Sequence, residues 1–463
     1  MDLIRSRAVL GYVLKAAVLV GLAATAVQSV LVPRALYADG AYNLWLVLNT
    51  ESFVVIGPAR TFAILLNQIP VVTAMTLGVR DLDALFGFYT FGVAAVPVLI
   101  WLAALAIQLR QRFFWPLVVI YATAFLNSGF IAIGEYTYAF ALVALAVSIL
   151  VGRGALRAWL AVPLVGASVA LILCYEGMVF LGLPLMVLAL VRLRRPAWLG
   201  VEGSSRAERV VLWCVFVCFT LSVAVGGLSI GLRTLNSADT NLAGALNVQS
   251  AVETNRQWQV STAIAVLLLV IALVRNKVVA TVASLLVAGA AGVLFQTSYW
   301  SPAWLHYNSR SLATFTFAAL LVLALLVLVV ENRRASRVGP GAADRVGVRD
   351  LAFGLAASVL LFSMTWSFWS LTEGYDVWLA DLQDVVVEGA GPIDIASTDL
   401  YSVEGSQYSW GWTNPYLSAL LQTENGQGSV LSHVETLDAF TPISPASSPE
   451  FFERYHRTAG ASS

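Results

Sequence analysis

The sequence predicts an all-α polytopic membrane protein of about eleven transmembrane helices, followed by a small extracytoplasmic α/β domain at the C-terminus. The first observation is composition: 59% of residues are hydrophobic and only 12% are charged, against about 25% charged in an average soluble domain. The mean hydropathy is +0.79. The second observation is that the charges are grouped between long apolar runs, and the third is that basic loops alternate with acidic ones.

The apolar runs predict eleven spans. They lie at residues 8–32, 83–108, 114–134, 138–152, 156–174, 177–191, 210–231, 259–274, 278–296, 311–330 and 351–370. The first run is longer than the apolar region of a signal peptide, so we expect it to remain as the first span. Several of the other runs are near the shortest apolar length that crosses a bilayer.

Charge predicts the orientation of these spans. With the N-terminus in the cytoplasm, 8 of the 27 Lys and Arg residues fall in outer loops, which leaves 19 in inner loops. Of the 27 acidic residues, 6 fall inside and 21 outside. No Asn-x-Ser/Thr sequon is present, which disfavours the eukaryotic secretory pathway. We therefore expect a multi-pass protein of a bacterial cytoplasmic (inner) membrane, with a cytoplasmic N-terminus and an extracytoplasmic C-terminus.

Residues 61–79 test this topology, because they are apolar enough to form a span. A span there would turn every later basic loop outward. It would also place Asn67 and Gln68 in hydrocarbon, where their polar groups need partners. The alternative that we favour is a long first outer loop, residues 33–82, with helices over 40–55 and 61–79 lying on the membrane surface.

The C-terminal residues 371–463 differ from the transmembrane domain, residues 1–370. They contain no candidate span and no lysine, and their turns are rich in Gly, Pro and Ser. We expect a small outer domain that is helical near 376–388. Four aromatic residues crowd one stretch of it: Tyr408, Trp410, Trp412 and Tyr416. Aromatic faces can stack on sugars, but packing within the domain or against the membrane region explains them equally well, and we favour packing.

Four carboxylates fall at the outer membrane boundary. Asp39 and Glu51 lie in the first outer loop, whereas Glu135 and Glu176 lie in tight outer turns. A carboxylate at the interface is costly to ionise unless it is paired or hydrated, so each is a candidate functional residue. The structural alternatives are a solvated turn for Asp39, and a helix end or a pair with Arg60 for Glu51. For Glu135 and Glu176 the alternative is an ion pair between helix ends.

Outer arginines supply cations for these carboxylates. They are Arg34, Arg60, Arg80, Arg233, Arg256 and Arg310. Arg310 joins the aromatic loop 299–310 to the tenth span, where the alternative is a helix-end arginine that reaches lipid headgroups. His306, just before it, fits an interfacial position as well as a binding one. With three histidines and three cysteines in the chain, we expect no His-rich metal cluster and no disulfide framework.

The order of these features resembles the GT-C class of membrane glycosyltransferases. In that class one span leads to a long outer loop with an acidic residue near its start, a position that Asp39 takes here. The stretch "RTFAILLNQIPVVTAMTLGVRDLDALFGF" then stands where the class has its surface helices and the entry to the second span. Glu135 takes the place of the acid of the second outer loop. The stretch "HYNSRSLATFTF", with Arg310, resembles the approach to a late span, so the likeness covers residues 1–330.

The resemblance implies inverting transfer of a hexosyl or pentosyl group from a polyprenyl-phosphate carrier to a glycan, lipid or protein acceptor of the cell envelope. Asp39 is then the general base, Glu135 orients the acceptor or Asp39, and Arg310 stabilises the leaving phosphate. The other substrate or phosphate contacts expected are Arg60, Arg80, Glu176, His306 and Tyr307.

Membrane lipids are expected partners of such an enzyme, and nucleic acid is not. The chemistry requires no cofactor, because phosphate is already a good leaving group. A divalent cation, Mg²⁺ or Mn²⁺, held between Asp39 and Glu135 is compatible with the residues but is not required.

Three other functions fit parts of the pattern. A transporter or flippase of lipid-linked sugars would place ionisable groups near the bilayer midplane, whereas the carboxylates here cluster at one face. A polysaccharide polymerase or ligase would be expected to carry its main loop late in the chain, and this long loop is early. A non-catalytic scaffold would leave the acidic loops as solubilising surface.

Overall fold

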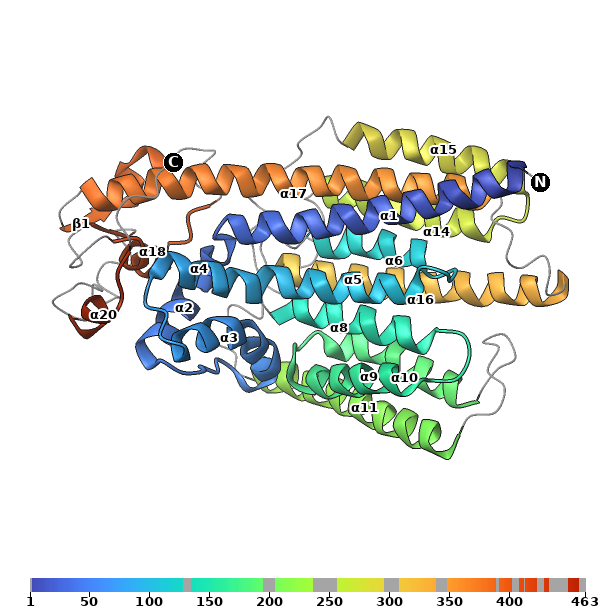
Figure 1. Ribbon diagram of the computed structural model, residues 1–463, viewed down its shortest axis with the longest axis horizontal. Helices are drawn as coiled ribbons and strands as arrows, with labels where there is room; N and C mark the ends of the chain where they lie inside the picture. The colour runs from blue at the N-terminus through green and yellow to red at the C-terminus, as the bar shows by residue number, and fades with distance from the viewer. Residues whose placement is uncertain are drawn as a thin grey trace.

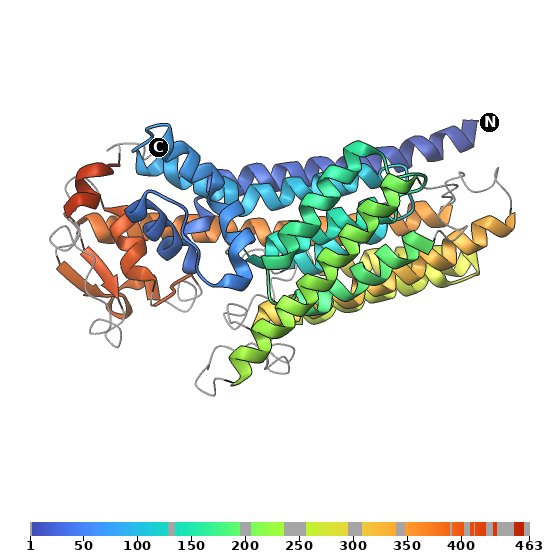
Figure 2. The same ribbon diagram turned by 90° about the horizontal axis from the view of Figure 1, so that it is seen from below.

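The computed structural model describes residues 2–127, 135–194, 205–235, 256–294, 308–338, 348–388, 391–401, 408–411, 413–422, 429–432 and 449–457. In this part of the chain the long helices run along one axis as an elongated bundle (Figure 1). The N-terminus lies at one end of the bundle, and the C-terminal elements lie at the other (Figures 1 and 2).

The bundle is built from long apolar helices. They are α1 (Asp2–Leu31), α4 (Leu82–Thr90) with η3 (Phe91–Ala95) and α5 (Val96–Gln108), α6 (Phe114–Ile120) with η4 (Tyr121–Leu126), α8 (Glu135–Leu150), α9 (Ala158–Ala170) with η5 (Leu171–Leu173), α10 (Met178–Arg194), α11 (Arg206–Leu235), α14 (Arg256–Leu273), α15 (Lys277–Leu294), α16 (Asn308–Val338) and α17 (Val348–Glu388). Helix α17 packs along α1 and α15, α5 packs on α8, and α10 packs on α11.

Membrane character follows from these helices. Five described segments are long and apolar enough to cross a bilayer: Val9–Leu31, Leu82–Gln108, Arg206–Leu235, Arg310–Arg334 and Val348–Glu388. Shorter apolar helices lie between them. Each of the eleven predicted runs coincides with a helix of the bundle, which confirms an all-α membrane protein in its main part. The number of helices that cross the bilayer stays a prediction.

The first outer loop forms the helices expected of it, α2 (Asp39–Thr50) and α3 (Thr61–Thr76). The buried side-chain amide of Gln68 in α3 is hydrogen-bonded. It accepts from the Val54 N–H and donates to the Val54 C=O, both at 2.9 Å. Helix α3 packs against η3 at Gly92, where an added Cβ would collide with the Asn67 carbonyl. These contacts fold the loop onto the end of the bundle; its position relative to the membrane stays a prediction.

Helix α17 does not stop at the predicted domain boundary. The expected span 351–370 and the expected helix 376–388 are one continuous helix, because the buried stripe continues through Tyr375, Leu379 and Leu382 at helical spacing. The sequence-based boundary at residue 370 therefore falls inside an unbroken helix.

The elements after α17 are short. They are β1 (Gly391–Asp394), η8 (Ile395–Ser397), η9 (Asp399–Tyr401), α18 (Asn414–Leu421), β2 (Ser429–Ser432) and α20 (Pro449–Arg454). Strands β1 and β2 pair in parallel, with Gly391 opposite Ser429. In Figure 1 these elements lie at the same end of the bundle as α2 and α3.

At the opposite end, Arg192 and Glu208 form a buried ion pair that joins α10 to α11. The guanidinium lies 3.6 Å from the carboxylate, and their side chains are only 2% and 3% exposed. Arg192 also donates to four carbonyls after or at the end of α8, among them Leu150 and Gly152, both at 2.8 Å. It thus caps the C-terminal end of α8, where a cation is favourable, and Glu208 accepts from the Leu156 N–H at 3.1 Å.

Candidate functional site

Six charged side chains form one ionic network where the first outer loop meets the bundle. In order of contact they are Asp39, Arg310, Glu135, Arg60, Glu176 and Arg233. Carboxylates and guanidinium groups alternate along it, so three negative charges face three positive ones. The residues come from α2, α16, α8, η2 (Pro58–Arg60), the turn before α10, and α11. Segments far apart in the sequence thus converge on one site.

Arg310 lies between the two carboxylates that the sequence singled out. Its Nη2 is 3.6 Å from Asp39 Oδ2, and its Nη1 is 3.7 Å from Glu135 Oε2. The Arg310 and Glu135 side chains are each 12% exposed. Both contacts are long for charge-assisted hydrogen bonds, which favour about 2.7–2.9 Å. The guanidinium therefore bridges the two carboxylates through contacts longer than strong charge-assisted hydrogen bonds.

Arg60 holds the second part of the network through shorter contacts. Its Nη1 lies 2.7 Å from Glu135 Oε1, and its Nε donates to Glu176 Oε1 at 2.9 Å. The Glu135 and Glu176 charges keep the pKa of Arg60 above its ordinary value. Arg233 approaches Glu176 Oε1 at 3.5 Å. Arg60 thereby ties the start of α3 to α8 and to the turn before α10.

Asp39 is held at the first turn of α2, where the helix dipole favours a negative charge. The residue before it, Ala38, has φ +50° and ψ −128°, a region that non-glycine residues rarely adopt and that stores strain. Tyr37 is buried against the edges of the Tyr375 and Trp410 rings, at centroid distances of 5.7 and 6.4 Å. The strained turn therefore has packing on its N-terminal side to maintain it.

The Asp39 carboxylate is only partly satisfied. Its Oδ2 faces Arg310, whereas Oδ1 is buried and has no hydrogen-bond partner among the described residues. Burial raises the pKa of Asp39, and the attraction of Arg310 only partly offsets this effect. A buried acceptor without a donor is costly, so the site favours a ligand that brings an O–H group to Oδ1.

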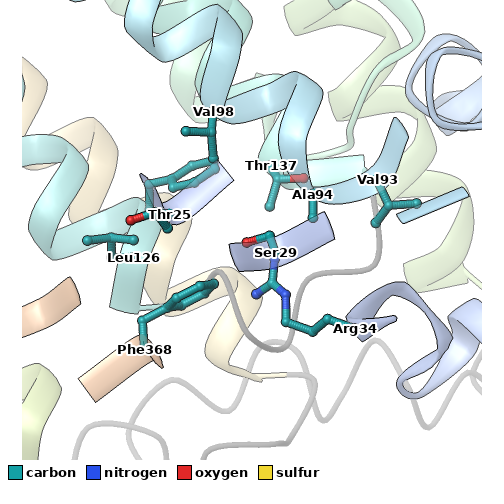
Figure 3. Close-up of a pocket in the computed structure, with 10 residues that line it drawn as sticks. Thr25, Ser29, Arg34, Val93, Ala94, Val98, Leu126, Thr137 and Phe368 are labelled. Atoms are coloured by element: carbon teal, nitrogen blue, oxygen red, sulfur yellow. The ribbon is translucent and has the colours of Figure 1, made fainter. Parts of the chain in front are cut away.

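A small cavity lies between α1, η3, η4 and α17 (Figure 3). It is lined by polar atoms of Thr25 and Ser29 from α1 and by Arg34 from the link to α2, among apolar side chains. The Arg34 guanidinium lies 4.4 Å from the centre of the Phe368 ring, and burial lowers the pKa of Arg34 to about 10. Sequence reasoning placed Arg34 with the outer carboxylates, but the structure turns it toward the bundle interior.

Not every predicted site residue joins the network. Arg80 pairs with Glu51 at 3.4 Å and lies over the Tyr455 ring. Glu51 ends α2, about 18 Å along the helix from Asp39 at 1.5 Å per residue. The predicted contacts His306 and Tyr307 lie outside the described residues.

The Arg310 guanidinium lies 3.6 Å from Asp39 and 3.7 Å from Glu135, and a divalent cation between these carboxylates stays a prediction. Within the described ranges, three or more metal-ligating side chains come together nowhere. The carboxylates are therefore arranged around an arginine.

The aromatic stretch of the C-terminal region packs as the structural interpretation expected. Tyr408 donates to the Leu371 carbonyl at 3.3 Å. Trp410 meets Tyr37, and Tyr416 meets Tyr42 at a centroid distance of 4.9 Å; Trp412 lies outside the described residues. These rings join the region to α2.

Comparisons of the chain with protein-family models, curated proteins and solved structures gave no match. A function for this protein is therefore inferred from the residues of the site.

Proposed function

We propose that this protein is an integral membrane glycosyltransferase of the GT-C type, which moves a hexosyl or pentosyl group from a polyprenyl-phosphate carrier to a glycan, lipid or protein acceptor. The observation that carries the proposal is the convergence of Asp39, Arg310 and Glu135, with one buried Asp39 oxygen lacking a donor among the described residues. These are a base, a cation and a second carboxylate in contact.

The chemistry assigns one role to each group. The acceptor hydroxyl attacks the anomeric carbon while Asp39 takes its proton, so a carbon–oxygen bond forms on one face of the sugar. The bond from the anomeric carbon to the phosphate oxygen breaks on the opposite face, and the electron pair leaves with the phosphate. Arg310 stabilises that charge electrostatically from its position between the two carboxylates. A single displacement of this kind inverts the anomeric centre.

Glu135 and Arg60 keep the reacting groups in place. Glu135 bonds Arg60 closely through one oxygen and holds Arg310 through the other. Removal of Glu135, or of the Arg60 that holds it, would let the Arg310 guanidinium move toward Asp39 alone. With three charges of each sign the network is neutral, so it adds no net negative charge that would repel an anionic phosphate.

The location that we propose follows from the chemistry of the donor. A sugar on a polyprenyl phosphate is presented at the membrane surface, and the network lies where α2 and α3 meet the ends of apolar helices. We assign this end to the extracytoplasmic face of a bacterial cytoplasmic membrane, with eleven spans and the N-terminus in the cytoplasm. Residues 371–463 would then lie outside as a small α/β domain.

Two substitutions of Arg310 distinguish the role of its positive charge from that of its two-sided contact geometry. We expect Arg310→Lys to lower kcat for sugar transfer about 100-fold, because a point charge cannot bridge both carboxylates. Arg310→Gln should lose more, and added guanidinium should restore part of the rate. The assay uses purified protein in lipid with a polyprenyl-phosphate sugar. Arg157→Lys, at an exposed arginine of the opposite end, is the control, and equal loss in both lysine variants would remove Arg310 from the mechanism.

The pH profile reports on Asp39. A base must be deprotonated, and burial raises the pKa of Asp39 above its ordinary value of 3.8. The rate should therefore fall with acid at a higher pH than an exposed aspartate would dictate. Arg310→Gln should move this limb further upward, since Arg310 opposes the shift. An acid limb that stays in place in Arg310→Gln would contradict the assignment of the base.

A further inference from the structure

The last described residues of the chain, 449–457, contact α2 and α3 of the first outer loop and the start of α4. We name them the C-terminal strap. The Tyr455 hydroxyl donates to the Leu48 carbonyl at 3.1 Å and lies 3.4 Å from Glu51 Oε1, at the end of α2. The same hydroxyl lies 3.5 Å from Met75 Sδ at the end of α3. One side chain thus joins two helices of the loop.

A second set of contacts joins the strap to α4. The Leu82 N–H donates to the His456 carbonyl at 2.9 Å, in a short bridge between the two segments. Arg457 pairs with Asp83 at 2.7 Å and also donates to the Leu421 carbonyl of α18 at 3.1 Å. The strap therefore links the first outer loop to the C-terminal region.

The strap is buried where it crosses α2. Phe451 and Tyr455 are 2% and 3% exposed, and the Phe451 ring lies 4.2 Å from that of Trp45, between centroids. Full burial of such a side chain contributes about 1.5–3 kcal/mol. A loose chain end does not bury two aromatic rings in this way.

C-terminal segments thus pack against helix α2 at both of its ends. Tyr375 and Trp410 pack on Tyr37, next to the strained turn that leads to Asp39, and the strap fixes the opposite end. With 12 residues, α2 is too short to be stable alone in water. Its position, and the 3.6 Å contact of Asp39 with Arg310, must come from these neighbours.

We propose that the C-terminal strap is a positioning element for Asp39. Phe451 and Tyr455 fix α2, and α2 carries the carboxylate at its first turn. The expected effect on rate rests on the proposed glycosyltransfer, but the effect on α2 does not. In that reaction a misplacement of the base by about 1 Å costs on the order of 100-fold in rate.

The test compares the native chain with Phe451→Ala/Tyr455→Ala in lipid nanodiscs. Hydrogen exchange of the α2 amides should become at least about 10-fold faster, while α5 and α8 keep their protection. The kcat for sugar transfer should fall about 10- to 100-fold, with the KM for the donor changed less than about 2-fold. The single variant Phe451→Leu, which keeps apolar burial, should retain most of the α2 protection and most of the kcat. Glu453→Ala, at an exposed position of the same strap, is the matched control and should change neither.

Unchanged exchange in α2 of the double variant would overturn the proposal, whatever the enzyme assay gives. If the native chain transfers no sugar, the exchange measurement still decides the role of the strap, and only the proposed function fails. Should the double variant not fold, Tyr455→Phe decides by the same two measurements, because it removes only the hydroxyl contacts to Leu48 and Glu51.

Discussion

Asp39→Asn should lower kcat for sugar transfer by about 1,000-fold and leave the fold intact. The amide keeps the size of the side chain but cannot accept the proton of the acceptor hydroxyl, and loss of a positioned base costs about 10²–10⁴ in rate. Glu135 still holds Arg310 at 3.7 Å. The measurement is single-turnover transfer from a polyprenyl-phosphate sugar by purified protein in lipid.

The thermal stability of Asp39→Asn separates catalysis from folding. Burial raises the pKa of Asp39 in the folded chain. The contribution of a group with a raised acidic pKa is complete below its unfolded pKa, and it is lost as the pH rises through the folded pKa. At neutral pH the ionised Asp39 therefore opposes folding, and the neutral variant should melt no lower than the native chain. Asp381→Asn, at an exposed position of α17, is the control for both measurements, and a fully active Asp39→Asn would exclude Asp39 as base.

Arg192→Met should destabilise the protein by about 3–5 kcal/mol, because it leaves the buried Glu208 carboxylate without its cation. It also removes the donors that cap the last carbonyls of α8, including Leu150. The expected result is a large fall in the melting temperature of the protein in detergent, at unchanged catalytic rate per folded molecule.

The double variant Arg192→Met/Glu208→Leu should recover much of this loss, since apolar pairs often replace buried ion pairs at little cost. Arg157→Met, at an exposed arginine of the same end, should change the melting temperature little. A double variant as unstable as Arg192→Met alone would show that capping of α8, and not the unpaired carboxylate, accounts for the effect.

Much of the site could be predicted from the sequence because interfacial charges are costly. Asp39, Glu135 and Arg310 drew attention as ionisable groups beside apolar runs, and the structure places them in contact. Glu176 and Arg60 join them for the same reason. The helices of the bundle followed from apolar length, and α3 forms within the helix predicted over 61–79.

What the sequence could not predict depends on long-range pairing. Arg80 flanks the same apolar segment 61–79 as Arg60, and only the fold shows that it pairs with Glu51. The continuity of α17 depends on packing of Tyr375 against residues far along the chain. The contacts of the C-terminal strap could not be predicted, because nothing in "PEFFERYHR" indicates which distant segment it meets. Its two aromatics at helical spacing, Phe451 and Tyr455, indicate only a buried face.

The sidedness of the first outer loop is the most direct test of the central claim, that the ionic network faces the extracytoplasmic side. The chain should be freed of its three cysteines and given single cysteines at the exposed positions Ser52 and Ala155. A membrane-impermeant thiol reagent added to intact cells should label Ser52→Cys and leave Ala155→Cys unlabelled until the membrane is opened. Labelling of Ala155→Cys in intact cells, with Ser52→Cys protected, would place the network in the cytoplasm and contradict the account.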